Sequence, residues 1–174
     1  MGQLYDVAPF KGFHPEIGIL LSSLEDSTRE WRENLGELPG EAIIWQPAPK
    51  GHSVGALILH MIDCESYWFE AFAAGKERDP EEVKLWMSEE TGQFDAEWPV
   101  PPSAPLAWYY AEQDRIRARS LEALRGLDPE RRYQRKGEEF TLRWIVAHIL
   151  EHDSYTGGQA VLLHEQWKKA QTSG

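Results

Sequence analysis

Three histidines in this chain have the residue type and spacing of a metal site. His148 and His152 are four residues apart in a segment that reads as a helix, so both imidazoles can reach one ion. His60 lies on the apolar stripe of another predicted helix. A lone buried histidine is usually a hydrogen-bonded core residue, and an i, i+4 pair also arises by chance. Three histidines on two facing stripes are harder to explain as core residues, so we predict that His60, His148 and His152 bind a divalent metal.

The chemistry of such a site would be catalytic. Three imidazoles leave at least one coordination position open, which is typical of catalytic rather than structural metal sites. Zinc, nickel, iron and manganese all accept nitrogen ligands, and the sequence does not choose between them. The ion would lower the pKa of a bound water or thiol and so supply a nucleophile near neutral pH.

Other polar residues near these histidines have simpler interpretations. Cys64, one turn after His60, could be a further ligand, but a buried free cysteine more commonly serves as a small apolar side chain. His14, His52 and His164 lie near predicted helix ends, and we expect them to be surface or capping residues. The flanking acidic residues could orient an imidazole, but we expect most of them to be solvated: Asp63, Glu65, Glu151 and Asp153.

Four long helices are predicted to position these groups. Apolar residues recur at three- and four-residue steps over about 14–35, 53–75, 103–124 and 141–168. We therefore expect an all-α fold, a four-helix bundle that forms a single domain over residues 1–174.

The segments between these helices add detail. Ser53 and Thr141 are predicted N-caps of the second and fourth helices. The connection between helices two and three is acidic and rich in proline, with one short helix near 80–87. A long crossover connection at this point can place helices two and three side by side in the same direction. A short extended pair is predicted around Gly137, and Gly157 with its neighbour Gly158 predicts close packing in the fourth helix, because glycine there costs stability.

Composition limits the classes of partner. Lys and Arg number 18 and Asp and Glu 29, and the net charge of 18 − 29 = −11 disfavours a nucleic-acid binder. The single cysteine excludes an internal disulfide. No apolar run approaches the roughly 20 residues that span a bilayer, and residues 1–12 lack a signal-peptide pattern. We expect a cytoplasmic protein with no nucleic-acid or membrane partner. Its eight tryptophans favour a homodimer, because aromatic side chains are enriched at interfaces.

Four motifs, taken in order and spacing, resemble the DinB/YfiT-like superfamily of metal-dependent enzymes. They are the loop WQPAPKGHS at 45–53, the segment LILHMID at 57–63, the segment TLRWIVAHILEH at 141–152, and the pair Gly158-Gln159. The resemblance covers roughly residues 10–170. It implies a four-helix bundle with a long crossover, often a homodimer, and a divalent metal held by three histidines at one end of a central cavity.

The resemblance also implies a ligand set, and this sequence departs from it. His60 and His152 match two of the three family ligands, but the third falls at position 156, which is Thr156. Three alternatives follow. His148 replaces the missing ligand from one turn earlier; or His60 and His152 bind metal with water or the Thr156 hydroxyl; or the site has decayed to a polar network without metal.

The function implied by the resemblance follows from its better-known members. These join a low-molecular-weight thiol to an electrophile, and other relatives are hydrolases or isomerases. The expected function is therefore a divalent-metal-dependent thiol transferase or hydrolase that acts on a small molecule in the bundle cavity. The alternative is a metal-free bundle that binds a small molecule or serves only as a structural dimer.

Overall fold

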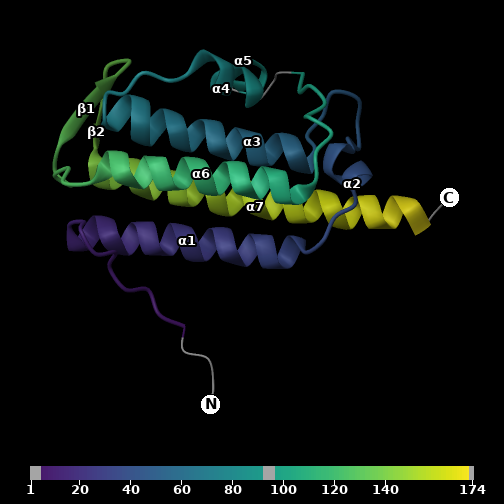
Figure 1. Cartoon of the computed structure of the whole chain (residues 1–174), viewed down its shortest axis with the longest axis horizontal. Helices are drawn as coiled ribbons and strands as arrows, with labels where there is room; N and C mark the ends of the chain where they lie inside the picture. The colour runs from purple at the N-terminus through teal and green to yellow at the C-terminus, as the bar shows by residue number, and fades with distance from the viewer. Residues whose placement is uncertain (1–4, 92–96, 173–174) are drawn as a thin grey trace.

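The computed structural model describes residues 5–91 and 97–172 of the chain. Most of these residues are helical, as predicted for an all-α protein. Four long helical segments run side by side along the longest axis of the molecule (Figure 1). They are α1 (Pro15–Leu35), α3 (Val54–Glu65) with its π-helical continuation η1 (Ser66–Ala73), α6 (Leu106–Leu124) and α7 (Leu142–Thr172).

Short elements cover the two ends and one side of these helices. The hairpin of β1 (Arg132–Arg135) and β2 (Glu138–Thr141) matches the extended pair predicted around Gly137, and it closes one end (Figure 1). Near the other end lies α2 (Gly40–Ile44), a helix that the proline- and glycine-rich sequence did not predict. Above α3 lie α4 (Pro80–Leu85), which matches the predicted short helix, and α5 (Ser88–Thr91).

The long connection brings α3 and α6 together in the same direction. Arg117 of α6 bonds Glu65 at the end of α3 at 2.8 Å, and Ser120, further along α6, bonds Glu70 in η1 at 2.9 Å. Contacts therefore advance in the same sense along both segments, as the predicted crossover requires.

Both predicted N-caps are confirmed by hydrogen bonds. The Ser53 hydroxyl accepts the backbone N–H of Ala56 at 3.3 Å, and the Thr141 hydroxyl accepts that of Trp144 at 3.2 Å. Each bond satisfies one of the free N–H groups in a first helical turn. The starts of α3 and α7 are thus fixed by the local sequence.

The second predicted helix changes character after Glu65. Its last two turns form the π-helix η1, in which Tyr67 and Phe72, five residues apart, stack with ring centroids 6.3 Å apart. A regular α-helical period would place Tyr67 and Ala71 on the same face as His60 and Cys64, whereas both are only partly buried. The wider π turn buries Phe69 instead, because it rotates the later side chains about the helix axis.

Of the two adjacent glycines predicted to mark close packing, only Gly157 lies in a close contact. A Cβ atom on Gly157 would lie 2.4 Å from the indole of Trp31, whereas one on Gly158 would meet nothing within 4 Å. Gly157 therefore lets α1 and α7 approach each other, and Gly158 has no such role.

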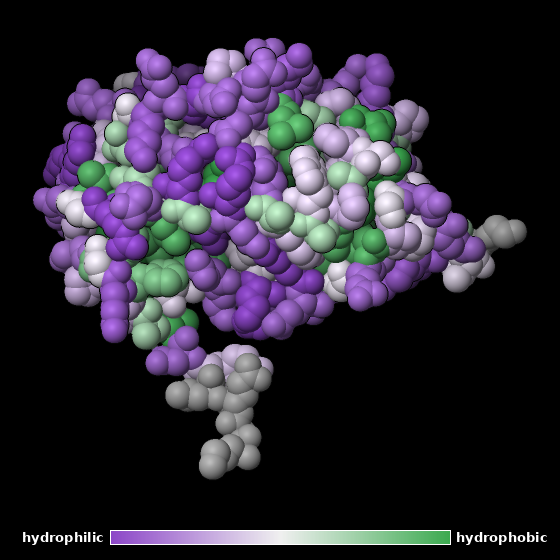
Figure 2. All heavy atoms as spheres, viewed as in Figure 1, coloured by the Kyte–Doolittle hydropathy of each residue, from purple (hydrophilic) through white to green (hydrophobic). Residues whose placement is uncertain are grey.

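One face of the molecule is largely polar. On the face drawn in Figure 2, hydrophilic residues predominate and hydrophobic residues form separate patches. Within the described part of the chain, no helix has both the length and the apolar content needed to cross a membrane.

Candidate metal centre

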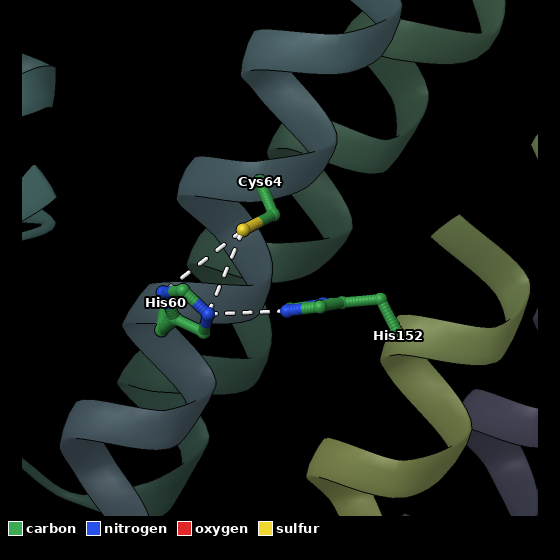
Figure 3. A group of neighbouring side chains, drawn as sticks. All are labelled: His60, Cys64 and His152. Carbon is green, nitrogen blue, oxygen red and sulfur yellow. Dashed lines mark hydrogen bonds between the residues drawn. The ribbon is translucent and has the colours of Figure 1, made fainter. Parts of the chain in front are cut away.

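His60 and His152 meet between α3 and α7. Their Nε2 atoms lie 3.1 Å apart, and the ring centroids are separated by 4.9 Å (Figure 3). The two helices run in opposite directions, because Trp68, further along α3 and η1, contacts Trp144, which lies earlier in α7. The predicted inner stripes of two distant segments thus place these imidazoles against each other.

Cys64 completes a cluster with the two histidines. Its Sγ atom lies 3.6 Å from Nε2 of His60, one turn earlier on α3, and points toward that ring (Figure 3). One donor atom from each of His60, Cys64 and His152 lies within 4.8 Å of the other two. We expected Cys64 to serve as a small apolar side chain, but its sulfur lies close enough to both imidazoles to be a candidate metal ligand.

His148 faces the same pocket but stands outside this cluster. Its ring stacks on Trp144, with centroids 4.7 Å apart and planes 8° apart, and it also contacts the edge of Trp68. The centroid of His148 lies 6.5 Å from that of His152. Of the three predicted ligands, the structure brings two together and packs the third among aromatic rings.

Burial determines the protonation of the cluster. Burial, together with the nearby imidazoles of His60 and His148, lowers the pKa of His152 to about 3. Burial also lowers the pKa of His60, while the carboxylate of Asp63 acts in the opposite direction. Both rings are therefore neutral at pH 7, the state that binds metal. Burial raises the pKa of the Cys64 thiol to about 12.

A pocket of about 210 Å³ opens onto the cluster. Its described lining includes His52, Trp98 and Tyr155, and contains no carboxylate, lysine or arginine. A more open groove of about 500 Å³ between α1 and α7 has no histidine or cysteine among its described lining residues. The pocket beside the cluster is therefore the place where a small molecule and the imidazoles can meet.

The loop before α3 shapes this pocket by holding Trp98. The backbone N–H of Trp98 donates to the carbonyl of Lys50 at 2.8 Å, and the carbonyl of Trp98 accepts from Nε2 of Gln46 at 3.1 Å. His52 packs edge-on against Trp98, with centroids 4.2 Å apart. His52 thus lines the pocket and is not simply a surface or capping residue. The sequence contained one indication of this role: His52 immediately precedes Ser53, the N-cap of the helix that carries His60.

The sequence model of the DinB superfamily matches residues 23–160, which is well over half of the chain. The chain belongs to the DinB superfamily. A search of curated proteins finds no match. The matched span contains His60, Cys64 and His152, so the cluster lies within the part of this DinB chain that the family defines.

Position 156 of this DinB chain faces the same pocket. Thr156 is 1% exposed and lines the pocket. Its hydroxyl interacts with the side chain of the adjacent Tyr155 but makes no hydrogen bond of good geometry among the described residues, so it can accept or donate a further bond. The donor set as a whole fits a divalent ion, because two neutral imidazole nitrogens and a sulfur lie within 4.8 Å of one another.

The acidic residues beside the histidines do not contact them. Asp63, Glu65 and Asp153 are buried, contrary to the expectation that most would be solvated, and only Glu151 is exposed. Asp63 pairs with Arg78, and Glu65 with Arg117. Burial of these carboxylates is tolerated because cations and hydrogen-bond donors from distant segments surround them.

Asp153, which follows His152 on α7, is held by several hydrogen bonds. Its carboxylate accepts the indole N–H of Trp31 at 3.0 Å and the hydroxyl of Thr28 at 3.1 Å, and Arg117 approaches it at 3.8 Å. These contacts lie on the side of α7 away from the pocket. They set the rotation of α7 and thereby direct the preceding side chain, His152, toward α3.

His164, the third of the histidines expected at helix ends, is buried. Its Nδ1 lies 3.0 Å from the carbonyl of Leu35 at the end of α1. It therefore caps that helix, as one of the two predicted roles requires. His14 is exposed beside the start of α1.

Proposed function

We propose that this DinB-superfamily chain is a divalent-metal-dependent enzyme that transfers a thiol to, or hydrolyses, a small molecule bound in the pocket beside His60 and His152. The observation that carries the proposal is the 3.1 Å separation of two neutral imidazole nitrogens on the wall of a pocket whose described lining includes no carboxylate, lysine or arginine. Two nitrogens bound to one ion lie about 3.4 Å apart when each metal–nitrogen bond is near 2.05 Å. Little movement is needed to accommodate the ion.

The protein groups have distinct roles in this proposal. His60 and His152 hold the ion, whether zinc, nickel, iron or manganese, and the ion when bound lowers the pKa of a thiol or water. His52 accepts the released proton at a ring nitrogen, because burial lowers its pKa and keeps the ring neutral at pH 7. Trp98 and Tyr155 pack against the substrate and exclude water.

The character of the pocket favours an uncharged electrophile. Its described lining contains no permanent charge that would stabilise a phosphate, carboxylate or ammonium group. A low-molecular-weight thiol could enter from the open side, where Tyr155 is 48% exposed. We therefore propose a low-molecular-weight thiol and an uncharged small molecule as the preferred pair of substrates.

The wider organisation belongs to the same proposal. We infer that α1, α3, α6 and α7 form the four-helix bundle of the superfamily, within one domain over residues 1–174. The homodimer stays a prediction, and its original basis is weaker, because Trp31, Trp68, Trp86 and Trp98 are buried in a single chain. The cytoplasmic location also stays a prediction.

The test is an assay of thiol consumption with an uncharged activated halide, and of water-dependent ester cleavage, before and after chelation. We expect activity that is lost with a chelator, restored by divalent metal and abolished in His152→Gln. His52→Gln should lower kcat while leaving metal content unchanged. Activity that survives chelation would contradict the proposal.

A second candidate is a metal-free binding protein, favoured by the aromatic wall that His52 and Trp98 form. It predicts that the chain binds uncharged aromatic molecules equally well with and without chelator. Calorimetric titration of a small aromatic panel, in parallel on wild type and His152→Gln, separates the two candidates.

A further inference from the structure

In the pattern that the resemblance implies, two ligands lie four residues apart on the last helix. In this chain a pair of donor residues with this spacing lies on α3. That pattern places the pair on the last helix, at positions 152 and 156, and here position 156 is a threonine. On α3, however, His60 and Cys64 form a donor pair with the same spacing, and both face His152 across the pocket. Position 156 offers no imidazole, whereas α3 supplies a donor pair with this spacing.

We propose that Cys64 is the third protein ligand of the metal, bound as a thiolate beside His60 and His152. The inference rests on the proposed metal site and adds its ligand set. A sulfur and a nitrogen bound to one tetrahedral ion lie about 3.5 Å apart, given bonds near 2.3 and 2.05 Å. The distance from Sγ of Cys64 to Nε2 of His60 is 3.6 Å.

An independent observation at the same pocket points to an absent partner. The hydroxyl of Thr156 is buried and lines the pocket with Cys64 and His152; apart from an interaction with the side chain of Tyr155, it makes no hydrogen bond of good geometry among the described residues. A metal with two imidazoles and one thiolate keeps an open position for water or substrate, and a molecule bound there can satisfy this hydroxyl.

The position of His148 separates this ligand set from the one with three histidines. Its ring is stacked on Trp144 and bounded by Trp68, so its use as a ligand requires that these contacts break. Cys64 needs no such change. Binding forms a metal–sulfur bond from a thiol electron pair, and the thiol proton goes to solvent without change of oxidation state.

A thiolate ligand determines which ions the site prefers. Soft sulfur favours zinc and cobalt over manganese and magnesium, which prefer oxygen ligands. The site should therefore discriminate against manganese more strongly than a site with three imidazoles does. This narrows the four candidate metals toward zinc.

The test uses cobalt(II) added to the chelator-treated full chain. A thiolate bound to cobalt gives an intense near-ultraviolet charge-transfer band, and the chain has one cysteine, so the band reports on Cys64 alone. We expect the band in wild type and in His148→Gln, and its loss in Cys64→Ser and Cys64→Ala. Removing a residue that only supports a ligand costs about 10–100-fold in metal affinity, so removing the ligand itself should cost at least about 100-fold.

Two other outcomes overturn the inference in distinguishable ways. If wild type binds cobalt without the band, and Cys64→Ser keeps its affinity while His148→Gln loses it, the third ligand is His148 and the proposed function stands. If wild type does not bind cobalt at all, the inference and the proposed metal-dependent function both fail. Circular dichroism of each variant checks that the fold is retained.

Discussion

The Nε2 atoms of His60 and His152 lie 3.1 Å apart, although 92 residues separate them in the chain. The contact depends on how α3 and α7 are rotated about their own axes. Glu65 follows Cys64 on α3, Asp153 follows His152 on α7, and both carboxylates approach the guanidinium of Arg117. A buried ionic group behind the pocket therefore fixes the helices that carry His60 and His152 relative to each other.

Removal of Arg117 should be strongly destabilising. Arg117→Met leaves Glu65 and Asp153 buried without their shared cation, and removal of one partner from a buried ionic group costs about 3–5 kcal/mol. Arg29→Met is the matched control, because Arg29 pairs with Asp26 and Glu33 at the surface, where such pairs contribute about 0–1 kcal/mol. Urea unfolding measures both variants. Equal stability of the two would show that Arg117 does not hold the helices.

The two adjacent glycines of α7 should respond in opposite directions to alanine. Gly157→Ala places a methyl group against Trp31 and should cost about 1–3 kcal/mol through overpacking. Gly158→Ala meets nothing within 4 Å and should gain up to about 1 kcal/mol from helix propensity. Thermal unfolding of both variants tests the close approach of α1 and α7. The account of that contact fails if Gly157→Ala is as stable as Gly158→Ala.

The metal-free protein should lose stability as pH falls below about 6.5, in part because of His152. Burial lowers the pKa of this residue to about 3 from its ordinary 6.5. Between these values the unfolded chain binds a proton that the folded chain does not, so lower pH favours unfolding. The contribution of His152 to the free energy of unfolding is fully present above pH 6.5. From pH 7 to pH 4 the free energy of unfolding falls by about 3 kcal/mol through this residue.

The control for this pH dependence is His152→Asn, measured under the same chelating conditions. The carboxylates and the remaining histidines titrate in both proteins, so the difference between their stability curves isolates His152. We expect the wild-type curve to be the steeper one between pH 6.5 and 4. Parallel curves would mean that His152 is not buried as the structure shows.

Helix content and two of the cluster residues were readable from the sequence, because both depend on local periodicity. Ser53 and Thr141 have the residue types of N-caps and so predict the starts of α3 and α7. The apolar stripes of these helices predict that His60 and His152 face inward. The resemblance to the DinB superfamily, confirmed by the match over residues 23–160, indicated that these two stripes face each other.

The remaining site features depend on contacts between distant segments. Cys64 has the pattern of an apolar core residue, and only the approach of α7 makes it a candidate ligand. Glu65 was expected to be solvated because its partner, Arg117, comes from another helix. His148 has the spacing of a ligand, but the aromatic rings around it cannot be read from helical periodicity. The π-helical turns of η1 likewise have no sequence signal in the α-helical period.

Metal binding by His60 and His152 is tested most simply by measuring the metal content of the protein, purified without a histidine tag and dialysed against zinc. The account predicts about one ion per chain in wild type and in His148→Gln, and almost none in His60→Gln or His152→Gln, since each loses a nitrogen ligand that the site requires. Each variant must retain the wild-type circular dichroism spectrum. A wild-type protein without zinc, or a full complement of zinc in His152→Gln, would contradict the account.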